Sequence, residues 1–140
     1  MRHLKLLLPI FIGMGVLSAY AQPYPNKPIK LIVGFAPGGA ADYVARNISV
    51  PLGQALGQPI VIENKPGAGS SIAAEQVAKS APDGYTILIA SPSSISVNPA
   101  LSPKLGYKPS DFQPISKITS SPVVIAVYPG TGINSVKELI

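Results

Sequence analysis

Three short apolar segments, the first two each followed by a glycine-rich turn and a helical pattern, dominate the first two thirds of the chain. These segments are 29–36 (IKLIVGFA), 59–63 (PIVIE) and 85–90 (YTILIA). Short apolar runs rich in β-branched residues are typical of strands buried on both faces of a parallel sheet. The order strand, helix, strand, helix, strand with short loops therefore predicts an α/β fold, in which a parallel sheet is flanked by helices.

The segments between these strands have the residue spacing of amphipathic helices. From Ala40 to Leu56, apolar residues recur at intervals of three and four, and Gly57 provides a stop signal. Pro51 lies inside this span and is expected to kink the helix or to split it into two. Residues 71–81 form the second helical pattern, which ends at a Pro-Asp-Gly turn.

The pattern weakens after the third predicted strand. Residues 91–102 (SPSSISVNPALS) are rich in serine and proline and predict a loop that can include a short helical turn. Residues 107–112 resemble a helical turn, and residues 113–129 predict one or two further strands. Residues 135–140 begin a helix with a capping box, and no stop signal follows. We therefore expect the sequence to be cut within this last element.

The first 21 residues have the three regions of a secretory signal peptide. Arg2 and Lys5 give a positive start, and residues 6–17 form an apolar stretch without charge. Ala19-Tyr20-Ala21 then supplies the small residues that a signal peptidase reads. An uncleaved membrane anchor is the alternative, but about a dozen apolar residues are fewer than the roughly 20 that a spanning helix needs. We expect export and cleavage after Ala21.

Missing residue types narrow the chemistry. The chain has no cysteine, and its single histidine, His3, lies in the predicted signal peptide. The mature product would have no thiol nucleophile, disulfide, imidazole base or His/Cys metal site, which excludes a Ser-His-Asp hydrolase, and we expect no cofactor. The formal net charge is +5, but the basic residues are scattered singly, which argues against a nucleic-acid partner.

The turn after the first strand is the strongest candidate for a binding site. Residues 34–42 (GFAPGGAAD) join a buried strand to the start of a helix, where unpaired backbone amides and the helix dipole favour an anion. The segment lacks the Gly-Lys-Ser/Thr of a P-loop and the G-x-G-x-x-G of a dinucleotide site. The alternative is a plain glycine turn in which Asp42 complements the helix dipole.

Two further loops follow the second and third strands. Residues 66–71 (PGAGSS) match a nucleotide pattern only weakly, and the alternative is that Ser70 or Ser71 caps the helix. The third loop offers hydroxyl and amide groups suited to a carboxylate, with a solvated loop as the alternative; these residues are Ser91, Ser93, Ser94, Ser96 and Asn98. Parallel strands end at one edge of a sheet, so all three loops are expected to lie together.

Four segments of the chain resemble one known family. They are 24–33 (YPNKPIKLIV), 37–42 (PGGAAD), 62–69 (IENKPGAG) and 81–86 (APDGYT). In this order they resemble the N-terminal part of the tripartite tricarboxylate transporter substrate-binding proteins, the TctC or Bug family of periplasmic receptors. Jointly the segments are highly specific, although no single one would suffice. Ser70-Ser71 departs from the family, in which Gly followed by Asn or Thr is common.

The resemblance implies two α/β lobes of the type II periplasmic-binding-protein fold that close over a small carboxylate, such as a di- or tricarboxylate, an amino acid or a related acid. After the signal peptide at 1–21, it implies a first lobe at 22–120 and an incomplete second lobe at 121–140, since relatives are much longer. Backbone groups and ordered water would hold the ligand. The implied ligand-binding residues are Phe35, Pro37, Gly38, Gly39, Ala40, Asp42, Ser91, Ser93 and Asn98.

The resulting hypothesis is a monomeric, non-enzymatic periplasmic receptor that serves membrane transporter subunits or a sensor kinase of the tripartite tricarboxylate type. Because a single lobe leaves the ligand open to water, we expect this chain to bind carboxylates weakly or not at all. Two alternatives remain: a nonfunctional truncated remnant of such a receptor, and an exported enzyme that acts on anionic substrates with Asp42 as base.

Overall fold

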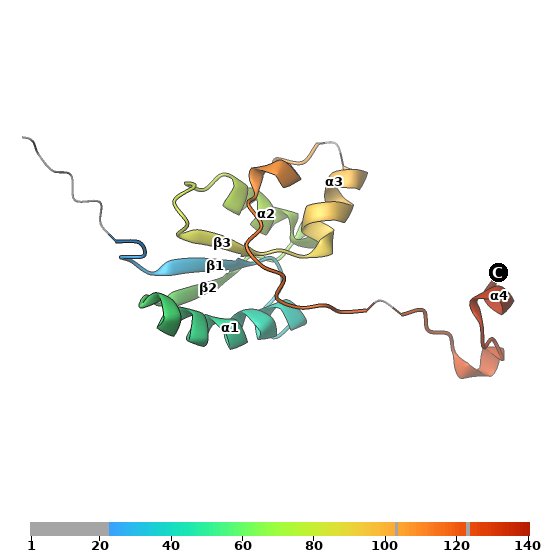
Figure 1. Ribbon diagram of the computed structural model, residues 1–140. Helices are drawn as coiled ribbons and strands as arrows, with labels where there is room; N and C mark the ends of the chain where they lie inside the picture. Colours follow the sequence, from blue (N-terminus) through green and yellow to red (C-terminus); the bar gives the residue numbers. More distant parts are fainter. Residues whose placement is uncertain (1–22, 103, 123) are drawn as a thin grey trace, which may run out of the picture.

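A small parallel sheet forms the centre of the computed structural model, which describes residues 23–102, 104–122 and 124–140. Its strands β1 (Ile29–Val33), β2 (Ile60–Asn64) and β3 (Thr86–Ile89) are arranged in the order β2-β1-β3 (Figure 1). Leu31 of β1 lies opposite Ile62 of β2 and Ile87 of β3. The predicted α/β class with a parallel sheet is confirmed, whereas the predicted signal peptide lies outside the described residues.

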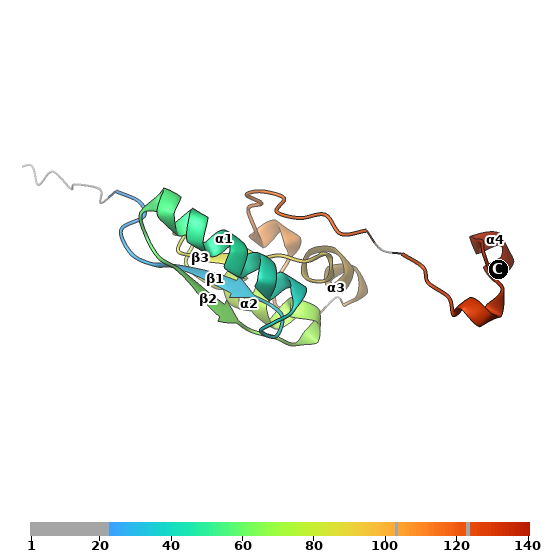
Figure 2. The same ribbon diagram turned by 90° about the horizontal axis from the view of Figure 1, so that it is seen from below.

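Two helices, α1 (Ala40–Leu56) and α2 (Ser71–Ala78), cover opposite faces of this sheet (Figures 1 and 2). Leu31 and Val33 of β1 share a buried cluster with Ala45 of α1. Ile32 lies between them in sequence, so its side chain points to the other face, and it is fully buried at 0% exposure. An unbroken apolar strand is thus buried on both sides, as its sequence predicts.

Helix α1 is continuous through Pro51, so of the two expected outcomes, a kink or a split, the split is wrong. A proline removes one hydrogen bond, here the one to the carbonyl of Asn47, and Asn47 is exposed, so water can reach that carbonyl. The predicted end is confirmed, because Gly57 adopts a left-handed conformation (φ 68°) and its amide donates to the carbonyl of Gly53. Helix α2 ends at Ala78, three residues earlier than predicted, before the turn that contains Pro82.

The segment after β3 is mostly helical, so the predicted loop is wrong, and the helical part is longer than the short turn that the sequence allowed. A π-helical turn, η2 (Ser93–Val97), continues into α3 (Asn98–Leu101). The hydroxyl of Ser91 accepts a hydrogen bond from the amide of Ser94 at 3.3 Å, as a residue at a helix start does, and Pro92 follows it. Serine and proline therefore begin a helix here rather than a loop.

Residues 113–122 and 124–128 run away from the sheet without helix or strand (Figure 1). The strands predicted within 113–129 are wrong for the described part of this range, where no strand is formed. The predicted turn before it is confirmed as η3 (Pro109–Asp111). Beyond the segment lie η4 (Pro129–Thr131) and α4 (Val136–Leu139), and the hydroxyl of Ser135 caps α4 by accepting from the amide of Glu138.

Candidate functional site

The three loops at the carboxyl ends of the strands lie together, as the sequence predicts. The side-chain nitrogen Nδ2 of Asn64, the last residue of β2, donates to the carbonyl of Phe35 in the first loop at 3.0 Å. From the third loop, Asn98 Nδ2 reaches the second loop, at 3.1 Å from the carbonyl of Ala68 and 3.0 Å from that of Gly69. Side-chain amides therefore tie the first loop to the second and the second to the third.

The first loop ends in an open helix start. Gly39 precedes α1 in an extended conformation without a side-chain cap, and the first helical hydrogen bond runs from the amide of Tyr43 to the carbonyl of Gly39 at 2.9 Å. The amides of the three residues between, from Ala40 to Asp42, consequently have no acceptor within the helix. Residues 36–40 are exposed, so an anion can approach this helix start from solvent.

The carboxylate of Asp42 stabilises the conformation of the first loop through hydrogen bonds. The residue is buried (2% exposed), and its Oδ2 accepts from the amide of Gly38 at 2.9 Å and from Arg46 Nε at 2.8 Å. Oδ1 accepts from Asn64 Nδ2 at 3.0 Å. These donors, with Arg46 first, hold the pKa of Asp42 well below its usual range. Direct contact between Asp42 and a ligand stays a prediction.

The serines of the second loop do not cap α2, so that interpretation is wrong. Ser70 lies before the helix with φ 72°, and its side chain forms no capping bond. Its hydroxyl is buried beside Gly34 and has no hydrogen-bond partner among the described residues. The hydroxyl of Ser71 instead accepts from Asn98 Nδ2 at 2.7 Å and lies 3.3 Å from the hydroxyl of Tyr107. This loop is therefore packed against its neighbours.

The third loop is organised by its own serines. The hydroxyls of Ser91 and Ser94 lie 3.3 Å apart, and the Ser94 hydroxyl donates to the carbonyl of Ser91 at 3.0 Å. Ser94 is fully buried, whereas Ser91 and Ser93 are partly exposed at the helix start. Ser96 is exposed, so of the four predicted serines Ser94 is the one withheld from solvent, and Ser91, Ser93 and Ser96 can offer hydroxyls to a ligand.

Sequence reasoning missed Asn64, Ser71 and Tyr107 as residues that organise the site. Asn64 had a usable signal, because it ends a predicted strand at the same edge as the three loops. Tyr107 had none, since it lies 13 residues after Ser94 in a segment without a periodic pattern, yet its hydroxyl is 2.6 Å from the carbonyl of Ser94.

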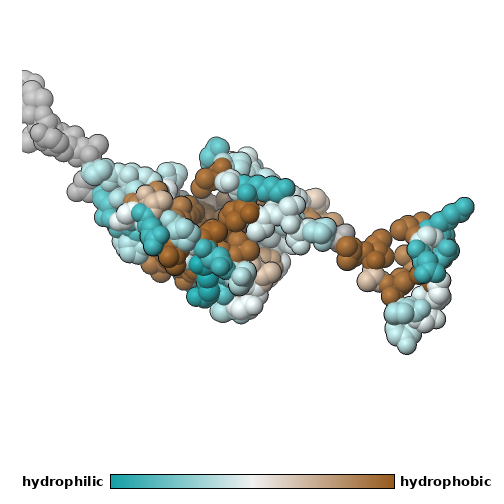
Figure 3. Space-filling view, turned by 60° about the horizontal axis from the view of Figure 1, so that its bottom comes forward, coloured by the Kyte–Doolittle hydropathy of each residue, from teal (hydrophilic) through white to brown (hydrophobic). Residues whose placement is uncertain are grey.

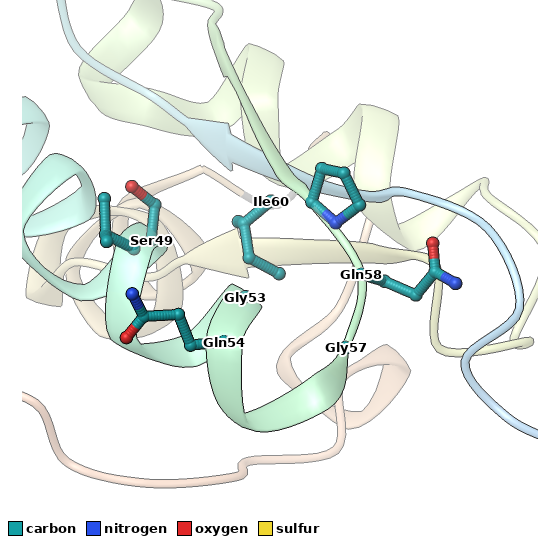
Figure 4. A pocket seen from close by; sticks show the side chains of 8 residues that line it. Ser49, Gly53, Gln54, Gly57, Gln58 and Ile60 are labelled. Carbon is teal, nitrogen blue, oxygen red and sulfur yellow. The ribbon is translucent and has the colours of Figure 1, made fainter.

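An open depression of about 440 Å³ lies at the far end of α1 (Figure 4). Gly53, Gln54 and Gly57 line it from the helix end, and Ile60 lines it from the start of β2. It therefore lies at the sheet edge opposite the three loops. Since the carboxyl end of a helix carries the negative end of the dipole, this depression is unsuited to an anion.

Metal binding has no support among the described residues, which contain no group of three or more His, Cys, Asp or Glu side chains suited to a metal ion. The charged side chains near the loops are instead used in ion pairs. Arg46 pairs with Asp42 at 2.8 Å, and Lys65 pairs with Glu63 at 2.7 Å. The site therefore offers backbone amides and neutral hydroxyls as its donors.

Comparison with known proteins decides the family. The sequence profile described as tripartite tricarboxylate transporter family receptor, TctC, matches residues 44–140. The chain belongs to this family. TctC-family proteins are periplasmic receptors, and the predicted resemblance and fold class are confirmed. Across the described residues of this TctC-family chain, no helix has the length and apolar character needed to cross a bilayer.

The relatives of this TctC-family chain are longer proteins. A UPF0065 protein of Bordetella pertussis is 40% identical over 137 residues, which cover 98% of this chain and 42% of that protein. MatC of Rhodopseudomonas palustris, solved with bound malate, is 43% identical with a TM-score of 0.65, over 68% of this chain and 33% of that one. A second R. palustris protein, solved with adipate, is 34% identical with a TM-score of 0.55, over 63% and 29% of the two chains. The chain thus spans 42% of the length of that first relative.

Proposed function

We propose that this chain forms the first lobe, residues 22–120, of a periplasmic solute-binding protein that captures a small carboxylate. The observation that carries the proposal is the exposed, uncapped start of α1, where the amides from Ala40 to Asp42 have no acceptor within the helix. MatC with malate and the second R. palustris protein with adipate both hold dicarboxylates, which supports a ligand of this class. Residues 121–140 would begin the second lobe.

In the proposed complex, one ligand carboxylate accepts hydrogen bonds from the amides at the start of α1. The negative charge of the buried Asp42 side chain does not repel the ligand, because Arg46 pairs with the Asp42 carboxylate at 2.8 Å. Hydroxyls of the third loop, from Ser91 and Ser93, supply neutral donors. The proposed ligand-binding set is Phe35, Pro37, Gly38, Gly39, Ala40, Asp42, Ser91, Ser93 and Asn98, with Asp42 and Asn98 acting by shaping the loops.

We propose a binding role without catalysis. A general base at neutral pH needs a pKa near that pH, whereas Arg46, Gly38 and Asn64 hold the pKa of Asp42 far below it. The alternative of an enzyme with Asp42 as base is therefore not favoured. The receptor would act in the periplasm after cleavage behind Ala21, and would hand its ligand to transporter subunits or present it to a sensor kinase.

A titration followed by ¹⁵N nuclear magnetic resonance tests this proposal. Malate and adipate should shift the amide signals of residues 38–42 and 91–98, with a dissociation constant weaker than about 1 mM because one lobe leaves the ligand in water. The dimethyl esters, which lack the charge, serve as controls and should leave these signals in place. If malate and adipate shift no signal of either loop, the proposed site is wrong, and submillimolar binding would contradict the need for a second lobe.

The variant Ala40→Pro sharpens this test. Proline is tolerated at the first position of a helix, where it removes only the amide. Gly39 already has the extended conformation that a residue before proline requires (φ −78°, ψ 172°). We expect carboxylate binding to weaken about tenfold with the fold unchanged, since a hydrogen bond to a charged group is lost. Ala40→Ser, which keeps the amide, is the matched control and should bind like the wild type.

A further inference from the structure

The helical turn of the third loop has a register that isolates one carbonyl group. The amide of Asn98 donates to the carbonyl of Ser93, five residues earlier, which is the hydrogen bond of a π-helix. In this register the next carbonyl, that of Ser94, would pair with the amide of residue 99. That residue is Pro99, which has no N–H group. The carbonyl of Ser94 is therefore left without a donor from the helix.

Tyr107 supplies the missing donor. Its hydroxyl lies 2.6 Å from the carbonyl of Ser94, and since a carbonyl can only accept, the tyrosine donates. Ser94 is 0% exposed and Tyr107 is 5% exposed, so water does not readily replace this bond. The ring of Phe112 packs edge-on against the ring of Tyr107, with centroids 5.8 Å apart. This ring contact adds to the hydrogen bond in holding Tyr107 in place.

The same hydroxyl closes a directed chain of hydrogen bonds between loops. Asn98 Nδ2 donates to the hydroxyl of Ser71 at 2.7 Å. The Ser71 hydroxyl lies 3.3 Å from that of Tyr107, whose own proton goes to Ser94, so Ser71 donates to Tyr107. The chain runs from the third loop through the second loop to Tyr107 and back to the third loop. A largely buried chain in which each donor has an acceptor favours one arrangement of its loops.

We propose that Tyr107 and Pro99 together are positioning residues for the binding site. Pro99 withholds an amide from Ser94, Tyr107 fills its place, and the pair fixes the π-helical turn that sets the position of Ser91 and Ser93. The part of this inference that concerns the ligand rests on the proposed function, whereas the part that concerns the turn can be measured without any ligand.

Amide hydrogen exchange in the full chain tests the turn. Tyr107→Phe leaves the buried carbonyl of Ser94 without a donor, and we expect the amides of residues 95–98 to exchange about tenfold faster or more. Tyr128→Phe is the matched control, because the side chain of Tyr128 is 78% exposed, and it should change nothing. If Tyr107→Phe alters these amides less than twofold, or accelerates the amides of β1 equally, the proposal is wrong.

Pro99→Ala provides a rescue that a purely structural role for Tyr107 would not give. Alanine restores the N–H group that the π-helical register directs at the carbonyl of Ser94. In the Tyr107→Phe background, Pro99→Ala should recover most of the lost protection of residues 95–98. A double variant that exchanges as fast as Tyr107→Phe alone would overturn the pairing of the two residues.

A malate titration of the same variants separates this inference from the proposed function. Tyr107→Phe should reduce the malate-induced shifts of residues 91–98 several-fold and leave those of residues 38–42 near wild-type size. If Tyr107→Phe reduces the malate-induced shifts of both loops by the same factor, or reduces neither, Tyr107 does not position the third loop. If the wild type itself shows no malate response, the proposed function fails, and the exchange measurements still decide whether Tyr107 and Pro99 fix the turn.

Discussion

The described chain has two regions that each contain an apolar, β-branched run but have opposite surroundings: the body, residues 23–102 and 104–112, and the tail, residues 113–122 and 124–140. Ile32, in β1 of the body, is 0% exposed, whereas Ile125, in an apolar run of the tail, is 71% exposed. Figure 3 shows hydrophobic residues, in brown, at the surface of the tail. Strand β1 pairs with a strand on each side, and the tail has no strand partner among the described residues. The difference shows that a β-branched run becomes a strand only where an edge is available to pair with it.

The largest test of this comparison replaces one isoleucine in each region. Ile32→Ala should lower the free energy of unfolding by about 3 kcal/mol, because it removes fully buried methyl groups and leaves a cavity. Ile125→Ala, the matched control in the tail, should change it by less than about 0.5 kcal/mol. Urea unfolding followed by circular dichroism measures both. Comparable losses in the two variants would mean that the tail packs on the body in solution.

A second test asks how tightly the loops of the body are packed. Gly34 lies against Ser70, and a Cβ atom added at Gly34 would come within 2.9 Å of the Cα of Ser70 as well as against its side chain. Gly34→Ala should therefore destabilise the chain by about 2 kcal/mol through overpacking. Adding Ser70→Gly should recover much of this loss, since it removes the side chain that clashes. Failure of the second change to help would place the strain elsewhere.

Ser70→Gly alone should stabilise the body by about 1 kcal/mol, because glycine adopts a positive φ without strain and the unpaired buried hydroxyl is removed. Ser70 has φ 72°, and its hydroxyl has no partner among the described residues. The midpoint of urea unfolding measures the change. A loss of stability would indicate instead that the hydroxyl of Ser70 is satisfied in solution, for example by a buried water molecule.

The order of strands and helices in the body, and the meeting of three loops at one edge, were predictable from periodicity and from the rule for parallel sheets. Individual contacts were not. One interpretation of the second loop was that Ser70 or Ser71 caps α2, but Ser71 bonds to Asn98, a partner 27 residues away. Local patterns describe local backbone, and they do not contain the long-range partner that a polar side chain finds.

The third loop and the tail were mispredicted for related reasons. Serine and proline at 91–102 favour a loop by composition, yet Ser91 and Pro92 stand where they begin a helix, and Tyr107 stabilises its irregular register. In the tail, the apolar β-branched residues do have a high strand propensity, but the predicted strands do not form. A strand needs a neighbouring edge to pair with, and the sequence pattern does not show whether one is available. The family resemblance was predictable because its four segments are short, ordered and specific.

The smallest expected effect concerns the pH dependence of stability. It is tested by comparing two carboxylates with lowered pKa values, one in each region. Asp42 in the body is stabilised by Arg46, Gly38 and Asn64, and Glu138 in the tail by the amide of Asn134 first. A group whose folded pKa lies below its unfolded value adds stability above an unfolded pKa of about 4, and this stability is lost as pH falls below that value.

Only a group whose proton affinity changes when the cooperative unit unfolds contributes to that loss. Asp42→Asn should therefore lower stability at neutral pH and flatten the decline between about pH 5 and pH 2, whereas Glu138→Gln should leave the decline of the body unchanged. The effect of Asp42 stays modest because the Arg46 side chain is 57% exposed and salt screens the pair. Urea midpoints measured across this range check both variants. A flatter decline in Glu138→Gln would show that the tail unfolds together with the body, so the two regions would not be independent.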